Sequence, residues 1–488
     1  GRHSVWDRRT GQVQEYWVYP HFNYGHDTRE MPYRFQRTAP LIVSPHDSSV
    51  LYHGSHLVHR SNDGGQSWKA ISPDLTAFED ETQGYSGEPI TRDITGEEIY
   101  SAIYTIAESP HRTGVLWVGA NDGPIHVSRD GGESWTHVTP AGLPPGGRVN
   151  RIEPSPHAPG RAYAAIYRFR LDDWRPYVYR TDDWGATWRL LTDGRNGIPA
   201  DTPVRVVRED PDRENLLYAG TEFGIYVSFD GGANWQSLQL DLPVTPVTEI
   251  VVHERDLVIS TMGRSFWVLD DLTPLHQLTD FVAESELWLF EPRPAHRVRW
   301  VGSLERSFPG YAPEYPEPGA AVDYWLGQDS EEPVSLDVVD AQGRLVRSFT
   351  SESPSDAETQ PREQGMRGPE DSVPTPSLGS SRGHHRFVWD LRARGPRPIG
   401  EGERGRGPMV LPGEYGLRLR HGDRTLEGQL FVEPDPRVIA AGLSRDDLEA
   451  QYGLATAIVE RLDRLSRTVE RIRELREQVD AASTRAGK

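Results

Sequence analysis

The sequence contains no cysteine, and this absence removes several classes of chemistry at once. Without thiols the chain has no disulfide, no cysteine-ligated zinc or iron–sulfur site and no thiol nucleophile. Any covalent chemistry would need another nucleophile. The lack of cysteine does not by itself reveal the compartment in which the protein works.

Long apolar runs and an excess of positive charge are also missing. The longest apolar runs, such as Leu454–Val459, are far shorter than the ~18 residues that cross a bilayer, so we expect no membrane span. The chain has 53 Lys and Arg against 73 Asp and Glu, a net charge of −20. A field of that sign repels phosphate backbones, which argues against nucleic acid as a partner.

The remaining composition is that of an ordinary globular protein. Hydrophobic residues make up 36% and charged residues 26% of the 488 residues, enough to bury a core and to form several domains. The sequence begins with Gly1 and has neither an initiator Met nor the hydrophobic region of a signal peptide. This start predicts a processing or cloning boundary at residue 1.

A repeat organises the first half of the chain. The pattern Ser/Thr-x-Asp-x-Gly-x-Ser/Thr/Asn-Trp occurs at 61–68, 128–135, 181–188 and 228–235, each time between two strand-like runs. We expect hairpin turns there, in which Gly supplies positive φ and Asp accepts local backbone N–H bonds. The structural residues of these turns are Asp63, Trp68, Asp130, Trp135, Asp183, Trp188, Asp230 and Trp235.

A second element precedes each copy at a similar offset. It consists of a strand, a proline-containing turn and another strand, and it begins at Ile42, Ile106, Ile152 and Val207. Each repeat thus holds four strands within roughly 45 to 65 residues, which is typical of a β-propeller blade.

The repeat ends in a degenerate copy. The segment from Glu249 supplies three strands but no Asp-containing turn. We expect the opening hairpin, Val5–Pro20, to complete this last blade, because an open ring would leave strand edges exposed. The prediction is an all-β propeller of about six four-stranded blades over residues 1–275, or part of a larger ring.

The four turns match the Asp-box, or BNR, repeat, and the region from Val5 to Leu275 resembles the sortilin-like and xyloglucanase-like branch of Asp-box β-propellers. The resemblance implies the fold more strongly than a function, since that group includes sialidases, xyloglucanases, sorting receptors and photosystem assembly factors. It also implies a secreted or periplasmic location. The Arg-Ile-Pro opening motif of sialidases does not precede the first turn, which argues against sialidase activity.

After residue 275 the pattern changes. Residues 276–319, with Pro292 and Pro294, predict a linker packed on the propeller. Alternating strands over 320–436 predict a small β-sandwich, and its PGEYGLRL and VSLDVVDAQGRLVR patterns resemble an immunoglobulin-like module. Within it, residues 351–383 are rich in Ser, Pro, Glu and Gly and predict a disordered insertion.

The last segment, 437–488, predicts a long amphipathic helix. Apolar residues recur there at spacings of three and four: Ile458, Leu462, Leu465, Val469, Ile472, Leu475 and Val479. A single helix cannot bury such a stripe alone. We therefore expect it to pack on another helix or on another subunit.

Candidate binding residues follow from the topology of a blade. Hairpin connections alternate between its two faces, so the Asp-containing turns and the proline turns share one face and the longer loops lie on the other. On this loop face we expect a binding site formed by His56, Asp93, Arg148, Trp174 and Arg264. Asp122 and Glu222 provide the carboxylate pair that a glycosidase requires.

Histidines of the proline turns suggest a metal site at first sight. His46, His111 and His157 occupy equivalent positions on different blades, however, and so lie too far apart to share one ion. We expect no metal and no cofactor.

Two functions remain open. The first is a secreted or periplasmic binding or assembly protein, not an enzyme, that recognises a protein or a glycan with its loop face. The alternative is a glycoside hydrolase that acts on polysaccharide through Asp122 and Glu222.

Overall fold

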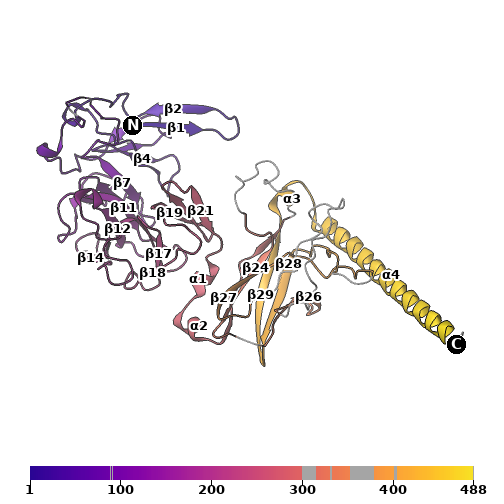
Figure 1. Ribbon diagram of the computed structural model, residues 1–488. Coiled ribbons are helices and arrows are strands. Elements are labelled where there is room, and N and C mark those ends of the chain that lie inside the picture. Colours follow the sequence, from indigo (N-terminus) through magenta and orange to yellow (C-terminus); the bar gives the residue numbers. More distant parts are fainter. Residues whose placement is uncertain are drawn as a thin grey trace. The chain divides into compact units, whose positions relative to one another are not determined.

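The computed structural model describes residues 1–87, 89–90, 92–298, 315–329, 332–351, 378–399 and 404–486. Its Cα positions divide into two compact units, Gly1–Asp270 and Asp271–Lys488 (Figure 1). The division falls five residues before the predicted end of the propeller.

The N-terminal unit is a β-propeller of antiparallel sheets, as the repeat predicts. Four sheets are four-stranded, with the strands in sequence order, and a fifth has three strands. We call them blades 1 to 5. Blade 1 contains β3 (Leu41–Val43), β4 (Leu51–Gly54), β5 (Val58–Ser61) and β6 (Lys69–Ala70), and blade 2 contains β7 (Ile103–Glu108), β8 (Leu116–Ala120), β9 (Ile125–Ser128) and β10 (Thr136–His137). Blade 3 contains β11 (Arg148–Pro154), β12 (Ala162–Tyr167), β13 (Tyr177–Thr181) and β14 (Arg189–Leu190), and blade 4 contains β15 (Val204–Glu209), β16 (Leu217–Thr221), β17 (Ile225–Ser228) and β18 (Gln236–Ser237). Blade 5 contains β19 (Val247–His253), β20 (Asp256–Thr261) and β21 (Phe266–Leu269). Short 3-10 helices lie at Thr28–Glu30, Asp80–Thr82 and Phe169–Leu171.

Box turns, as we call residues 61–68, 128–135, 181–188 and 228–235, connect the third and fourth strands of blades 1 to 4. In the first, Asp63 accepts hydrogen bonds from the Ser61 hydroxyl at 2.7 Å and from the Ser67 backbone N–H at 3.0 Å. The same two bonds recur in the other three turns. In a tight turn some backbone N–H groups have no backbone acceptor. The carboxylate supplies that acceptor.

Three of the box tryptophans join their blade to the one before it. The indole N–H of Trp135 donates to the carbonyl of Ile71 in blade 1 at 3.1 Å, and that of Trp188 to Val138 in blade 2 at 2.6 Å. Trp235 repeats this contact with Leu191 of blade 3 at 3.2 Å. Each acceptor directly follows the outer strand of its blade, so the repeat in sequence becomes a repeated joint between sheets.

Proline turns, at 44–50, 109–115, 155–161 and 210–216, join blades in the opposite direction. His46 Nε2 lies 2.8 Å from the carbonyl oxygen of Ser109 on the next blade, and His157 Nε2 lies 2.7 Å from that of Asp210. His111 makes the same contact with Ser155. A carbonyl can only accept, so each Nε2 carries the proton and is not a free metal ligand.

The expected ring closure is absent among the described strands. Strands β1 (Arg2–Trp6) and β2 (Val13–Trp17) pair only with each other, and β21 pairs only with β20. The expectation that the opening hairpin completes the last blade is therefore wrong for this structure. Instead His3 of β1 packs against Trp68 of blade 1, with ring centroids 5.3 Å apart.

The C-terminal unit contains the predicted β-sandwich. One sheet has the order β22 (Leu287–Leu289), β24 (Ala320–Leu326), β27 (Gly383–Trp389); the other has the order β23 (Ala295–Arg297), β29 (Arg424–Pro434), β28 (Gly413–His421), β25 (Val334–Asp340), β26 (Leu345–Thr350). Side chains from both sheets form one buried cluster around Trp389. Two strands, β22 and β23, lie within residues 276–319 and pair with β24 and β29, so the described residues up to 298 contribute to the sandwich rather than to a linker. Residues 352–377 of the predicted insertion lie outside the described residues.

Helices complete the C-terminal unit: α1 (Thr273–Gln277), α2 (Asp280–Glu284), α3 (Pro436–Ala440) and α4 (Arg445–Ala486). The long helix α4 contacts the sandwich through polar groups: the Ser466 hydroxyl donates to the Arg397 carbonyl at 3.0 Å, and Asp463 accepts from the Arg397 N–H. The apolar stripe remains exposed, with Leu465 at 50% and Ile472 at 59%. Among the described helices, none combines the length and hydrophobicity of a membrane span.

Candidate functional site

A cavity of about 160 Å³ opens on the loop face of the propeller. Its lining comes from the connection between blades 1 and 2 (97–100), the β8–β9 turn at Asn121, the start of β11 (147–148) and the end of β12 with the loop that follows (167–171). Parts of three blades therefore meet at this point. The cavity lies where the topology predicted it, among loops that are free to vary without disturbing the blades.

Three arginines line the cavity, and they are not equivalent. Arg168 is buried and holds the loop below it: its guanidinium donates to the carbonyls of Pro144 at 2.8 Å and Pro145 at 2.7 Å and pairs with Asp173 at 2.9 Å. Arg148 donates to the Tyr104 hydroxyl at 3.1 Å and lies over that ring. Arg170 is exposed.

Charge at the cavity is mixed, because Glu97 and Glu98 line it together with the three arginines. Among the described residues, neither Arg148 nor Arg170 forms an ion pair with a carboxylate. Burial lowers the pKa of the Arg148 guanidinium, and the positive charge of Arg170 adds to the lowering. Two guanidinium groups thus lie close together, and the nearby Glu97 carboxylate opposes the lowering without forming an ion pair with Arg148. Guanidinium groups that form no ion pair can donate hydrogen bonds to an anionic group in the cavity.

A row of tyrosine and arginine side chains continues from the cavity to blade 4. Arg148 is the register partner of Tyr167 across β11 and β12. Arg205 donates to the Tyr167 hydroxyl at 3.0 Å and to Glu222 at 2.5 Å. Burial raises the pKa of Tyr167, and its hydrogen bond with Glu222 adds to the rise. Glu222 is therefore tied into an ion pair, with 13% of its side chain exposed.

Asp122, the other candidate acid, lies next to the cavity but faces a loop. It is buried, and one of its carboxylate oxygens accepts backbone N–H bonds from Ala77 at 2.9 Å and Phe78 at 3.2 Å. Burial raises the pKa of Asp122. Its clearest role is to hold the connection between blades 1 and 2, where Phe78 adopts a positive φ of 48°.

Of the five predicted binding residues, only Arg148 lines the cavity. His56 accepts the backbone N–H of Arg34 at 3.3 Å, and burial lowers its pKa to about 4. Asp93 lies exposed on the connection between blades 1 and 2. Trp174 packs edge-on against Phe169, with 43% of its surface exposed. Arg264 lies exposed in the β20–β21 turn of blade 5.

Sequence reasoning missed Arg168 as the residue that shapes the cavity. Its three carbonyl acceptors, at Pro144, Pro145 and Gly146, lie on the connection between blades 2 and 3. The Pro-Pro-Gly-Gly run is the available signal, because such a segment exposes carbonyls that no strand satisfies. Nothing in the spacing of the sequence pairs that run with an arginine some twenty residues later.

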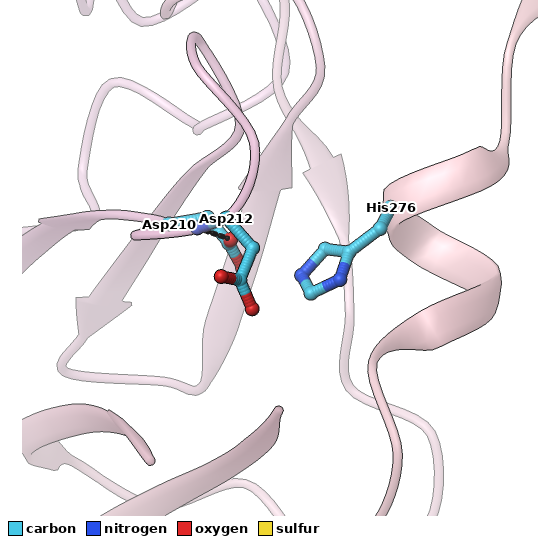
Figure 2. Close-up of side chains that lie close together, drawn as sticks. All are labelled: Asp210, Asp212 and His276. Atoms are coloured by element: carbon cyan, nitrogen blue, oxygen red, sulfur yellow. Dashed lines mark hydrogen bonds between the residues drawn. The ribbon is translucent and has the colours of Figure 1, made fainter. Parts of the chain in front are cut away.

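Acidic side chains of the fourth proline turn are shown in Figure 2. Asp210 accepts the backbone N–H groups of Asp212 at 2.8 Å and Arg213 at 3.0 Å, and it also accepts the Tyr218 hydroxyl at 2.9 Å. Asp210 thus satisfies backbone N–H groups of its own turn. His276, which Figure 2 also draws, belongs to α1 of the C-terminal unit.

A larger cavity lies in the C-terminal unit. It has a volume of about 440 Å³ and lies between the end of β29 and the start of α4, with Phe431, Ile439 and Leu448 among its lining residues. The lining is mainly apolar and open. Glu414, Glu433 and Arg445 also line it.

Comparisons with known proteins find distant likenesses over part of the chain. No family model matches the chain. A curated protein from Neosartorya fischeri, a probable oligoxyloglucan-reducing end-specific xyloglucanase, is 23% identical over 273 residues, which is 48% of this chain and 31% of that protein. The chain thus spans about a third of the relative's length.

Solved structures give distant likenesses. A GH74 xyloglucanase from Xanthomonas campestris is 19% identical with a TM-score of 0.39, over 54% of this chain and 40% of that one. YCF48 from Cyanidioschyzon merolae is 14% identical with a TM-score of 0.35, over 53% of this chain and 73% of that one.

Proposed function

We propose that the chain is a binding or assembly protein whose propeller recognises an anionic group of a protein or glycan at the loop-face cavity. The observation that carries the proposal is the pair of guanidinium groups, Arg148 and Arg170, which form no ion pair among the described residues although Glu97 and Glu98 line the same cavity. A charge-assisted hydrogen bond to an acidic ligand would satisfy both. Trp174 follows Arg170 closely in the sequence, and its exposed ring offers an aromatic surface for a sugar ring or a peptide side chain.

Finer assignments belong to the same proposal. We infer that the box turns are Asp boxes of the sortilin-like and xyloglucanase-like branch and that the sandwich is an immunoglobulin-like module. The repeated carboxylate bonds of Asp63, Asp130, Asp183 and Asp230 support the first inference. We also propose that the protein is secreted or periplasmic and that α4 packs on another helix or on another subunit.

The test measures binding of the full chain to arrays of neutral and acidic glycans and of peptides. We expect acidic ligands to bind, and Arg148→Met and Arg170→Met each to weaken binding about tenfold or more, which corresponds to about 1.4 kcal/mol. Arg264→Met is the matched control, since it removes an exposed arginine that does not line the cavity. Equal binding by all three variants would refute the proposal.

A glycoside hydrolase is the second candidate, and Asp122 favours it. A protonated acid beside an ionised carboxylate is the arrangement that glycosidases use, and burial raises the pKa of Asp122 while Arg205 holds Glu222 in an ion pair. The likeness to a probable xyloglucanase points the same way. A polysaccharide hydrolysis screen with Asp122→Asn and Glu222→Gln decides: turnover that both variants abolish, with the fold intact, would establish the enzyme.

A further inference from the structure

Opposite charges line the loop-face cavity without neutralising each other. Arg148, Arg170 and Glu97 all belong to the lining. The Glu97 carboxylate lies near enough to Arg148 for their charges to interact, yet the two form no ion pair among the described residues. Opposite charges in a partly desolvated space normally pair, because pairing offsets the free energy lost on leaving water. The space that keeps them apart is therefore suited to a ligand that carries both charges.

Glu97 is held in position by the loop that precedes blade 1. Its Oε2 accepts a hydrogen bond from the side-chain amide of Gln36 at 3.1 Å, and Gln36 is only 2% exposed. The Thr38 backbone N–H donates to the oxygen of the same amide at 2.7 Å, which fixes the orientation of the amide. The backbone beside Glu97 is also fixed, because the Arg37 N–H donates to the Gly96 carbonyl at 2.9 Å. The carboxylate thus keeps its place without a cationic partner.

Arg148 is fixed by an aromatic residue of the neighbouring blade. Its guanidinium lies over the Tyr104 ring, 4.4 Å from the ring centroid, and donates to the Tyr104 hydroxyl at 3.1 Å. A guanidinium has several N–H donors in one plane, so others remain for a ligand. Arg170 adds a second, exposed guanidinium to the same lining. Planar donors of this kind match the two oxygens of a carboxylate.

The second glutamate of the lining has a local role. Glu98 accepts the backbone N–H of Thr95 at 2.7 Å and the hydroxyl of Thr95 at 3.2 Å. Its carboxylate therefore stabilises the turn to which it belongs. Glu97 makes no such bond to its own turn, so it is the carboxylate that can receive a positive charge from a ligand.

The size of the cavity limits the ligand to one small unit. Its volume of about 160 Å³ is below the roughly 300 to 1,000 Å³ of pockets that take drug-sized molecules. Tyr100, Tyr167 and Leu171 also line it and provide aromatic and apolar surface beside the charged groups. A single amino-acid unit with an apolar side chain fits this combination of size, charge and surface.

We propose that the cavity recognises a zwitterion: an α-amino acid unit whose carboxylate binds Arg148 and Arg170 and whose free ammonium binds Glu97. The inference rests on the proposed function, because it identifies the anionic group as a carboxylate and adds a positive charge beside it. A phosphate or sulfate dianion would be repelled by Glu97, and a neutral sugar would leave the cavity charges unpaired. The free amino acid is the smallest molecule that carries both charges.

Three probes with the same side chain test the two charges separately. Leucine carries both charges, N-acetylleucine keeps the carboxylate alone, and leucinamide keeps the ammonium alone. Their affinities for the full chain are measured by isothermal titration calorimetry. We expect leucine to bind about tenfold or more tightly than either of the other two, because each of them loses one set of charge-assisted hydrogen bonds.

Variants of the cavity assign each charge of the ligand to its partner. Glu97→Gln removes the negative charge and keeps an oxygen that can accept from Gln36. We expect it to weaken leucine about tenfold and N-acetylleucine about twofold or less. Arg148→Met should weaken both. Glu133→Gln is the matched control, since Glu133 is exposed in the second box turn and does not line the cavity. Circular dichroism and urea unfolding check that each variant folds.

The outcomes separate this inference from the proposed function. Equal binding of leucine and N-acetylleucine, both weakened by Arg148→Met, would overturn the zwitterion and leave the recognition of an anionic group standing. A preference for leucine that Glu97→Gln does not reduce would also overturn it, and so would a failure of leucine to bind while acidic glycans or peptides bind through Arg148. If no ligand of any kind depends on Arg148, both proposals are wrong.

Discussion

Acidification should weaken blade 1 before blade 3, through His53. Its ring is 3% exposed, and Nδ1 donates to the Pro40 carbonyl at 2.8 Å. Burial lowers the pKa of His53 from 6.5 to about 4. Below pH 6.5 the unfolded chain therefore binds a proton that the folded chain excludes, so stability is full above pH 6.5 and is lost as the pH falls toward 4.

The size of the effect follows from the two pKa values. Between pH 7 and pH 5 the linkage relation gives a loss of about 2 kcal/mol for His53 alone. His59, whose pKa burial lowers to about 3, shifts stability in the same direction. The loss of about 2 kcal/mol from His53 is a large fraction of the free energy of unfolding of a typical domain.

The variant His53→Val isolates the contribution. Valine is the residue at the equivalent position of blade 2, where Val118 precedes Gly119 as His53 precedes Gly54. We expect the variant to lose about 1 kcal/mol at pH 7, with the hydrogen bond to Pro40, and to show a smaller loss on acidification. His253→Val, an exposed histidine in blade 5, is the control and should leave the pH dependence unchanged.

Hydrogen exchange measured by mass spectrometry, corrected for intrinsic rates, reads out each blade separately. At pH 5 relative to pH 7, residues 50–61 of blade 1 should lose protection while residues 161–167 of blade 3 keep theirs. Urea unfolding of the full chain gives the total change. If His53→Val shows the same loss between pH 7 and pH 5 as the parent chain, the explanation by His53 is wrong.

Two further predictions concern the box turns. Trp188→Phe should lower the free energy of unfolding, measured in urea, by about 1 to 2 kcal/mol, because it leaves the Val138 carbonyl of the neighbouring blade without its donor. Trp68→Phe should lower it less, because Trp68 bonds only within its own turn. Equal losses would contradict the role of the tryptophans as contacts between blades. The Ser134 hydroxyl and N–H hold the pKa of Asp130 at about 2, below its ordinary 3.8, so its stabilising effect should be present above pH 4 and fade as the pH falls toward 2. Acid unfolding of Asp130→Asn should therefore show a flatter profile in that interval, and an unchanged profile would contradict the assignment.

The blades were predictable from the sequence because their signals are local. A box turn is stabilised within eight residues, so its pattern survives without knowledge of the neighbouring sheet. Ring closure by Val5–Pro20 was not predictable in this way, since the alternation of a strand does not identify its partner. Residues 276–319 were assigned to a linker because of Pro292 and Pro294, yet β22 and β23 pair with β24 and β29, far along the chain.

The candidate site was predictable only as a face of the molecule. Alternating hairpins decide which loops lie together, and Arg148 is the predicted binding residue that lines the loop-face cavity. The choice among neighbours depends on tertiary contacts: Glu222 is neutralised by Arg205, His56 is buried under Arg34, and Arg168 is turned toward carbonyls of another loop. None of these partners lies at a spacing that a sequence pattern records.

The joint between blades 4 and 5 differs from those before it, with a mechanical consequence. Blade 5 has no box tryptophan, and the histidine of the fourth proline turn is replaced by Asp212, which makes an exposed ion pair with Arg255 at 3.6 Å. Arg208 adds a hydrogen bond to the Ile250 carbonyl and an ion pair with Glu249 at 2.9 Å near the inner strands. An exposed ion pair is screened by salt, whereas the indole and imidazole contacts of the earlier joints are not. Under tension or at high ionic strength we therefore expect the contact between blades 4 and 5 to break first, while blades 1 to 4 remain packed on one another.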